Sequence, residues 1–289
     1  MKFTVQADTL SALREALASQ CTGVRFGPEF CEWKIPSRDL LKKAYEAAKE
    51  TGKGFTYVSP PLSNQGIEKL VEQLDYLSEL KGSEVVVGDL GALNVLQDYE
   101  DIKPRLGRPR VYIPARSPWS QITRMPDPGF FTRRRVEKLF YQTSLNYVRS
   151  LEYYKSLGVM GADVDWIPNC FQSYGNVIKK GLKLAVHSHA VPVAVTMRCH
   201  MARFLGEEEP ALCSRPCLDK VFTIRQKELE RYFILNGNVV YQPVVSSQRE
   251  MKQLMRMGVD EVVLTMGPVS NLLTRNDVDE AIANLSGGA

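Results

Sequence analysis

The sequence has little of several features that mark specialised classes of protein. Lys and Arg number 37 and Asp and Glu number 33, so the net charge is only +4 and does not indicate a nucleic-acid binder. Six cysteines in 289 residues are too few for a disulfide scaffold. No stretch approaches the roughly 18 uncharged apolar residues of a membrane span. Hydrophobic residues make up 44%, which is enough for a full core and excludes a disordered chain.

The N-terminal segment also lacks the features of an export signal. MKFTVQADTL carries one Lys and then has the pattern of a strand, with no apolar stretch of signal-peptide length and no small-residue cleavage site. We therefore expect a cytoplasmic protein whose thiols stay reduced. In that compartment, clustered cysteines bind metal or carry out redox chemistry more often than they form disulfides.

Strand-like and helix-like patterns alternate along most of the chain. We predict strands at 3–7, 23–27, 55–58, 84–88, 110–113, 182–186, 239–241 and 261–265, and helices at 10–20, 37–51, 64–81, 133–157, 248–257 and 271–285. This βα repetition predicts an α/β fold formed by residues 1–289 as one domain, a (β/α)8-type barrel that is either complete or else incomplete or distorted. A doubly wound open sheet is the alternative, but no G-x-G-x-x-G follows the first strand.

One long segment interrupts the alternation and carries much of the basic charge. Residues 114–132 are rich in Pro and have no regular pattern, so we interpret them as an inserted loop. Residues 103–135 contain nine Lys and Arg and one Asp, a net charge of +8, which leaves −4 for the rest of the chain. Such a patch indicates either an anionic ligand or a solvated, arginine-rich loop.

Three of the six cysteines cluster in the spacing Cys199-x13-Cys213-x3-Cys217. The surrounding segment, 199–217, is polar and rich in turn-forming residues, unlike the apolar surroundings of a structural cysteine. A loop of this kind can wrap several thiolates around one metal centre, with a fourth ligand from elsewhere. The candidates for that fourth ligand are Cys21, Cys31, Cys170 and His200. All-thiolate ligation suits an iron–sulfur cluster or zinc, and the absence of C-x2-C pairs makes zinc the weaker interpretation.

Several motifs resemble those of the collagenase-like peptidase family. They are G-P-E-F-C at 27–31, V-V-V-G-D-L-G-A-L-N-V-L at 85–96, V-T-M-R-C-H-M-A-R at 195–203, the C-x3-C pair at 213–217, L-N-G-N-V-V-Y at 235–241 and G-V-D-E-V-V-L at 258–264. The resemblance covers residues 3–275 and is strongest to the UbiV-type members of oxygen-independent ubiquinone biosynthesis. The gap between Cys199 and Cys213 is one residue longer than in that type, and the 114–132 loop is an insertion.

The resemblance implies a barrel that binds one [4Fe–4S] cluster through Cys31, Cys199, Cys213 and Cys217. It also implies a component of an O2-independent hydroxylation system that modifies a ubiquinone precursor and acts as a heterodimer with a homologous, UbiU-like partner. A small anionic oxygen donor such as prephenate is a further expected ligand. Relatives that hydroxylate RNA bases make RNA an alternative substrate, and the aromatic residues among the arginines of 103–135 keep that alternative open.

Other residues are candidates for binding a substrate or an anion. They are Asp89, at the end of a predicted strand, Arg116 and Arg124, in the basic segment, and His187 and His189, near another strand end. Glu29 and Asp163 are weaker candidates of the same kind. The usual alternative for Asp89 is a helix N-cap. We do not expect peptidase activity, because neither G-x-S-x-G nor H-E-x-x-H occurs and the His-Ser-His triplet at 187–189 is weak evidence.

Overall fold

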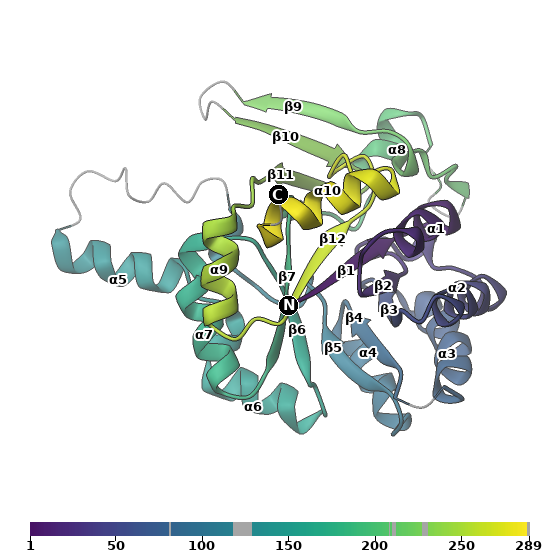
Figure 1. Cartoon of the computed structure of the whole chain (residues 1–289), viewed down its shortest axis with the longest axis horizontal. Helices are drawn as coiled ribbons and strands as arrows, with labels where there is room; N and C mark the ends of the chain where they lie inside the picture. Colours follow the sequence, from purple (N-terminus) through teal and green to yellow (C-terminus); the bar gives the residue numbers. More distant parts are fainter. Residues whose placement is uncertain (81, 118–128, 208, 210–211, 227–230, 288–289) are drawn as a thin grey trace.

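Eight parallel strands close into a barrel in the computed structural model, which describes residues 1–287 except 81, 118–128, 208, 210–211 and 227–230 (Figure 1). The strands are β1 (Lys2–Ala7), β2 (Gly23–Phe26), β3 (Gly54–Ser59), β4 (Glu84–Val87), β5 (Lys103–Leu106), β6 (Gly161–Asp165), β7 (Lys183–His187) and β12 (Glu261–Thr265). Their order around the barrel is β1-β12-β7-β6-β5-β4-β3-β2. The predicted (β/α)8-type fold is therefore confirmed.

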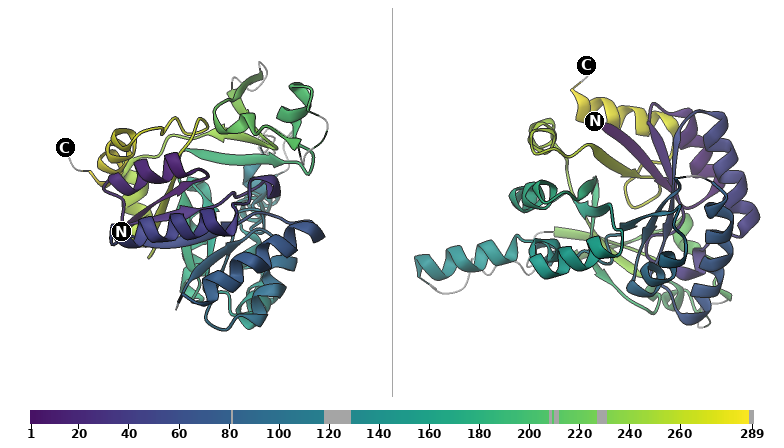
Figure 2. Two further views of the ribbon diagram at one scale, coloured as in Figure 1. Left: turned by 90° about the vertical axis from the view of Figure 1, so that its right-hand side faces the viewer. Right: turned by 90° about the horizontal axis from the view of Figure 1, so that it is seen from below.

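Most helices follow the strands and lie around the outside of the barrel (Figure 2). The helices are α1 (Leu10–Ala18), α2 (Arg38–Glu50), α3 (Asn64–Ser78), α4 (Leu90–Val95), α5 (Phe130–Phe140), α6 (Val148–Ser156), α7 (Phe171–Lys179), α8 (His200–Phe204), α9 (Gln248–Arg256) and α10 (Arg275–Ser286). Of these, α5 projects from the barrel and α8 lies beside the inserted sheet described below (Figures 1 and 2). Ser37 caps α2 as predicted, because its hydroxyl accepts a hydrogen bond from the Leu40 amide at 3.3 Å. Within the described residues, none of these helices has the length and apolar character needed to span a membrane.

Two barrel strands differ from the sequence prediction. The strand expected at 110–113 was wrong, since that segment is irregular and the barrel strand is β5, a few residues earlier. The strand β6 was not predicted at all. Both β5 and β6 carry charged side chains that are buried, namely Arg105 in β5 and Asp163 and Asp165 in β6. These charges form ion pairs with one another and with charges on other strands, which offsets the cost of removing them from water. The two strands can therefore be buried although their sequences are not apolar.

The helix expected at 133–157 was also wrong, because the chain breaks it into α5 and α6. At the break, the Thr143 amide donates to the Asn146 side chain at 3.1 Å, and the two residues form a capping box. These side-chain bonds compete with helical backbone bonds and favour a turn. Of the loop expected at 114–132, residues 114–116 form a short 3-10 turn, 118–128 lie outside the described residues, and α5 has begun by Phe130.

An antiparallel sheet is inserted between β7 and α9. It contains β8 (Ala190–Val195), β9 (Phe222–Gln226), β10 (Arg231–Asn236) and β11 (Val239–Pro243), in the order β8-β11-β10-β9. The predicted strand at 239–241 therefore belongs to this sheet and not to the barrel. Gly237, at φ 63°, and Asn238 form the two-residue turn between β10 and β11. The sheet lies across one end of the barrel, where it helps to enclose the site described below (Figures 1 and 2).

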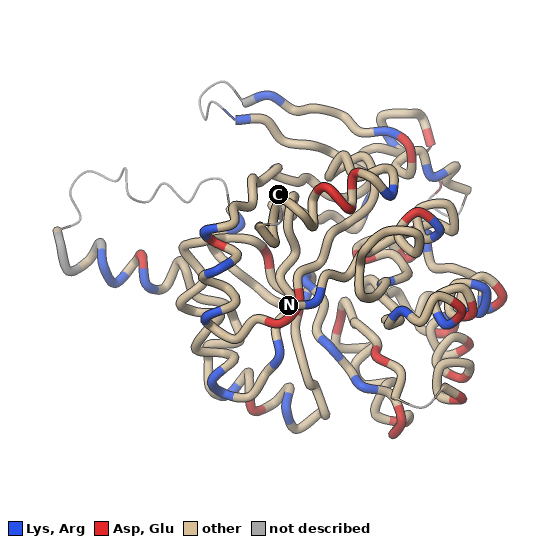
Figure 3. The backbone as a smooth tube through the Cα atoms, viewed as in Figure 1, with Lys and Arg blue, Asp and Glu red and all other residues tan. Residues whose placement is uncertain are grey.

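Basic residues are distributed over several elements and are not confined to one patch. Figure 3 shows Lys and Arg on α5, which projects from the barrel, but also on other helices and on the strands of the inserted sheet. Within the basic segment, Arg105, Arg108 and Arg116 form ion pairs, and Arg110 donates to the Tyr154 hydroxyl at 2.8 Å. At least four of the nine basic residues of this segment therefore have intramolecular partners.

Candidate functional site

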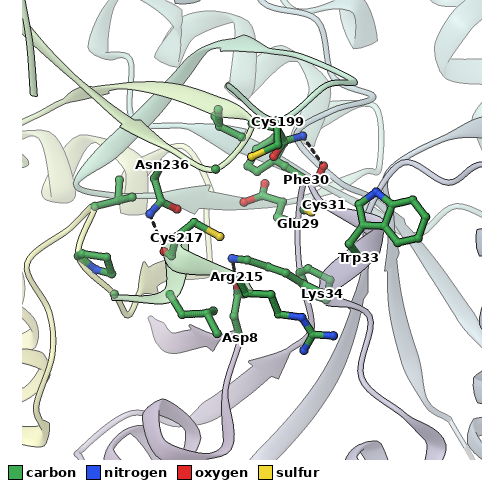
Figure 4. Close-up of a pocket in the computed structure, with 18 of the residues that line it drawn as sticks. Asp8, Glu29, Phe30, Cys31, Trp33, Lys34, Cys199, Arg215, Cys217 and Asn236 are labelled. Atoms are coloured by element: carbon green, nitrogen blue, oxygen red, sulfur yellow. Dashed lines mark hydrogen bonds and ion pairs between the residues drawn. The ribbon is translucent and has the colours of Figure 1, made fainter. Parts of the chain in front are cut away.

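A cavity of about 610 Å³ opens at the C-terminal ends of β1, β2 and β12 (Figure 4). Its barrel side is formed by residues at or just after the ends of these strands, at 8–9, 28–31, 33–34 and 265–270. Its other side is formed by residues of 198–218, which carries α8, and by the β10–β11 hairpin. The C-terminal end of a (β/α)8 barrel is the end at which such folds build their sites. The inserted sheet thus turns an open barrel end into an enclosed pocket.

Four of the six cysteines line this cavity, namely Cys31, Cys199, Cys213 and Cys217. Figure 4 shows the sulfur atoms of Cys31, Cys199 and Cys217 facing the same space. Burial raises the pKa of the Cys31 thiol to about 11, and the neighbouring Cys217 and Cys199 thiols raise it as well. Burial also raises the pKa of Cys213, again with a contribution from Cys199. The four sulfurs are therefore close enough to interact electrostatically.

The cavity thiols accept hydrogen bonds from backbone amides. Cys199 Sγ accepts from the Ala202 amide at 3.4 Å, and Cys213 Sγ accepts from the Arg215 amide at 3.4 Å. The Trp33 amide likewise donates to Cys31, which lowers the pKa of that thiol against the effect of burial. Donors directed at sulfur favour the thiolate, the form that binds metal.

The remaining two cysteines lie in the hydrophobic core and do not line the cavity. Cys21 Sγ donates to the carbonyl oxygen of Ala16 at 3.2 Å, so it acts as a thiol donor. Cys170 is fully buried, and burial raises the pKa of its thiol to about 12. Among the alternatives for a fourth ligand, only Cys31 shares the cavity with the three clustered cysteines, and His200 is not part of its lining.

Two residues of the cavity wall form a partly buried ion pair beside the thiols. Lys34 Nζ lies 2.8 Å from Asp8 Oδ2, and the Lys34 side chain is only 11% exposed. Figure 4 shows the amino end of Lys34 directed toward Cys217 and Asp8. Burial alone would lower the pKa of Lys34, but the Asp8 carboxylate and the thiols of Cys217 and Cys31 outweigh it and raise that pKa. The amino group is therefore a fixed positive charge at the thiol group.

A second ion pair fixes the segment that carries Cys31. Glu29 accepts two hydrogen bonds from the Arg108 guanidinium, one of them from Nε at 2.5 Å. Arg108 also donates to Asp165 at 3.1 Å and to the carbonyl oxygen of Ala190, at the start of β8, at 3.0 Å. This single guanidinium thus joins the loop after β2 to the barrel and to the inserted sheet. Bidentate pairing of this kind gives strong geometric definition.

Glycine is required where the Cys31 loop leaves the barrel. Gly27 has φ +123°, and a Cβ at this position would lie 2.2 Å from the carbonyl oxygen of Val58. Only glycine allows the backbone to turn this close to β3. The Gly-Pro-Glu-Phe-Cys segment is therefore shaped by one glycine and one buried ion pair before it reaches the cavity.

The barrel interior contains a separate network of buried charges. Arg25 binds Asp163 Oδ2 and Glu261 Oε1, each at 2.6 Å, and His187 Nε2 lies 3.0 Å from Asp163 Oδ2. Arg105 lies 3.4 Å from Glu261. Burial would raise the pKa of Asp163, but Arg25 and His187 hold it well below its usual range. Burial and the charge of Arg108 lower the pKa of His187.

The other predicted binding residues are not brought together at the cavity. Asp89 caps α4 by accepting from the Ala92 amide at 2.8 Å, and it also accepts from the Leu62 amide at 2.7 Å. Arg116 pairs with Asp165, His187 lies inside the barrel, and His189 contacts the Ser188 hydroxyl at 2.6 Å. None of these four residues lines the cavity. Arg124 lies outside the described residues.

Sequence reasoning missed Asp8, Lys34 and Arg108, which surround the cysteines. Asp8 directly follows β1, and Lys34 comes three residues after Cys31, so position after a strand was the available signal for both. Arg108 gave no such signal, because its role depends on Glu29, which is distant in the sequence. Glu29 itself was a weaker candidate and does line the cavity.

No family model matches the chain, and no curated protein matches it either. Solved structures of low similarity include dihydropteroate synthase from Thermus thermophilus in complex with 4-aminobenzoate, at 12% identity and a TM-score of 0.38, over 98% of this chain and 92% of that one. D-psicose 3-epimerase from Clostridium cellulolyticum is similar at 11% identity and a TM-score of 0.33, over 100% and 92%. YKL-39 with chitooligosaccharides is similar at 9% identity and a TM-score of 0.41, over the whole of both chains. At this level of similarity, none of these proteins bears on the activity of this chain.

Proposed function

We propose that the cavity binds a [4Fe–4S] cluster through Cys31, Cys199, Cys213 and Cys217. The observation that carries the proposal is that cysteines from two distant parts of the sequence line one cavity, while Cys21 and Cys170 do not. Amide donors to the sulfur atoms of three of the four agree with their acting as thiolate ligands. The motif resemblance identifies the same four residues.

We favour a cluster over a single zinc ion, because the sequence lacks the C-x2-C pairs of common structural zinc sites. Among the described residues, no three His, Cys, Asp or Glu side chains are arranged to hold one metal ion. Zinc would require its four ligands to converge at about 2.3 Å from one centre. In a four-iron cluster each thiolate binds a different iron, so the sulfurs stand farther apart. A cavity of about 610 Å³ lined by four cysteines has room for the second arrangement.

The wider role we propose is that of a component of an O2-independent hydroxylation system for a ubiquinone precursor, acting with a homologous, UbiU-like partner. This part rests on the resemblance of the motifs to the collagenase-like peptidase family. The cluster would supply one-electron transfer. The chain would enclose it and hold an anionic oxygen donor such as prephenate, for which the cavity offers the exposed side chains of Arg198, Arg203 and Arg215.

The alternative roles have less support. An RNA-modifying role depended on the basic and aromatic segment 103–135, and Arg105, Arg108 and Arg116 are committed there to ion pairs. A peptidase role would require a nucleophile and base at the pocket. Ser188 and His189 do contact each other, but neither lines the cavity.

Anaerobic purification or reconstitution, followed by iron and sulfide analysis and visible spectroscopy, tests the cluster. We expect about four irons and four sulfides per chain, the composition of one [4Fe–4S] cluster. Alanine at Cys31, Cys199, Cys213 or Cys217 should sharply lower the iron content. The matched controls, Cys21→Ala and Cys170→Ala, should retain it. A colourless protein without iron, or one that holds zinc, would reject the proposal.

Two experiments test the proposed substrate: isolation of the molecules bound to the protein in the cell, and measurement of ubiquinone-precursor hydroxylation in cells that lack the protein. Isolation under anaerobic conditions should recover a homologous partner chain. Cells lacking the protein should lose anaerobic hydroxylation of the ubiquinone precursor and regain it with the wild type but not with Cys199→Ala. Co-isolated RNA, with unchanged ubiquinone synthesis, would favour the RNA alternative.

A further inference from the structure

Lys34 occupies a distinctive position among the basic residues that line the cavity. The lining also contains Arg108, Arg198, Arg203 and Arg215. Arg108 is buried but is shared between Glu29 and Asp165, and the other three arginines are exposed. The Lys34 side chain is only 11% exposed, and the one carboxylate with which it pairs, that of Asp8, is 27% exposed. The positive charge of Lys34 is therefore shared with fewer carboxylates than that of Arg108 and is screened less by water than those of the exposed arginines.

The direction of the side chain places this charge next to the ligands. The Lys34 amino group points toward the Cys217 sulfur, with the Asp8 carboxylate on the side away from that sulfur (Figure 4). The ion pair is thus oriented with its positive end toward the thiols. Burying a net negative charge is costly unless a positive charge lies close by. A cluster held by four thiolates carries a net negative charge, which increases when it takes up an electron.

We propose that Lys34, held in place by Asp8, is the counter-ion of the thiolate group and sets the reduction potential of the cluster. This inference rests on the proposed function. Lys34 binds neither iron nor substrate, so it is a positioning residue that acts through the electrostatic field at Cys217. A nearby cation stabilises the reduced cluster more than the oxidised one, so it raises the reduction potential.

Spectroelectrochemical titration of the reconstituted protein tests the inference, with iron and sulfide content measured on each sample. In Lys34→Met, which removes the charge from a chain of similar length, we expect full iron content. The equilibrium between oxidised and reduced cluster should shift about tenfold toward the oxidised form, which is about 59 mV more negative for a one-electron couple. Lys34→Arg keeps the charge and should stay near the wild-type potential.

Two further variants make the test specific. Lys69→Met removes an exposed lysine that lies 5.7 Å from the Trp33 ring and outside the cavity lining, and it should leave the potential unchanged. Asp8→Asn removes the anion and keeps Lys34, so it should shift the potential in the opposite direction. If Lys34→Met does not fold, Lys34→Gln removes the same charge with a polar side chain and takes its place in the test.

The outcomes separate this inference from the proposed function. A wild-type protein that takes up no iron would reject the proposed function and the inference with it. Iron-loaded Lys34→Met with an unchanged potential would reject the inference alone. An equal shift in Lys69→Met would do the same, because it would show a general effect of net charge. An Asp8→Asn potential that does not rise would also contradict it.

Discussion

Inside the barrel, buried charges of opposite sign face one another, whereas in the cavity the thiols face one another. Asp163 contacts Arg25 and His187 in the barrel interior, so its charge is compensated within the chain. Burial raises the pKa values of Cys31 and Cys217 in the cavity, the neighbouring Cys199 thiol raises both as well, and Lys34 is the cation directed at them. Removing one member of a buried ion pair is strongly destabilising, whereas titratable groups with shifted pKa values in a cleft are typical of functional sites.

The largest expected effect breaks the barrel network. Arg25→Met should lower the free energy of unfolding of the metal-free protein by about 3–5 kcal/mol, because it leaves buried carboxylates without their cation. Arg275→Met is the control, since its pair with Asp279 is exposed and is worth about 0–1 kcal/mol. Denaturant titration measures both. A similar decrease in the free energy of unfolding in both variants would show that the Arg25 network stabilises the fold no more than an exposed ion pair does.

A smaller effect is expected where the two regions meet. Glu29→Gln removes the charge that pairs with Arg108 and should cost about 1.5–3 kcal/mol of unfolding free energy. Because Glu29 lies two residues before Cys31, the variant should also lose iron faster in the presence of a chelator. Glu84→Gln weakens a 3.5 Å ion pair of Arg105 away from the cavity and should leave iron release unchanged. Equal rates of iron release from the wild type, Glu29→Gln and Glu84→Gln would show that the Glu29–Arg108 pair does not help to hold the cluster.

The pH dependence of the free energy of unfolding should depend on His187 in the barrel interior. Because the pKa of buried His187 is lowered, the folded state keeps this histidine neutral where the unfolded chain takes up a proton. The contribution of neutral His187 to the free energy of unfolding is fully present above about pH 6.5. As the pH falls below that value the contribution is lost, with a slope that approaches about 1.4 kcal/mol per pH unit for one proton. His187→Gln should flatten the decline measured by denaturant titration between about pH 7 and 5, the range around the ordinary histidine pKa. An unchanged slope would show that His187 becomes protonated in the folded protein.

The smallest effects compare cysteines of the two regions in the metal-free protein. Cys170→Ala removes a fully buried sulfur and should cost about 1 kcal/mol of unfolding free energy. Cys213→Ala, at a partly exposed site, should stay within about 0.5 kcal/mol of the wild type. Thermal and denaturant unfolding measure the difference. The reverse order would indicate that Cys213 has a structural role in the absence of metal.

Much of the fold follows from local patterns in the sequence. Apolar strands such as β4 and amphipathic helices such as α2, with Ser37 as its cap, were predicted close to their true positions. The failures occurred where tertiary partners replace apolar character. The strands β5 and β6 contain Arg105, Asp163 and Asp165, whose burial depends on charges from other strands. Periodicity does not detect such strands, because it assumes that a buried position is apolar.

The candidate site divides in the same way. The spacing of Cys199, Cys213 and Cys217 indicated a metal-binding loop, and the position of Cys31 after a strand indicated the end of the barrel on which it lies. The anion-binding role predicted for Arg116 and His187 was inferred from the basic segment and from position near a strand end. In the structure the first is paired with Asp165 and the second with Asp163, and neither reaches the cavity.

The sequence by itself determined the barrel, most of its helices and the three clustered cysteines, because each of these depends on residues that are near one another in the chain. Tertiary structure decided the rest. Only the closed fold brings Cys31 into the cavity of the three clustered cysteines, directs Lys34 toward Cys217 and joins Arg108 to Glu29. These contacts depend on strand order and on the inserted sheet, and burial then strengthens the electrostatic interactions that they bring together.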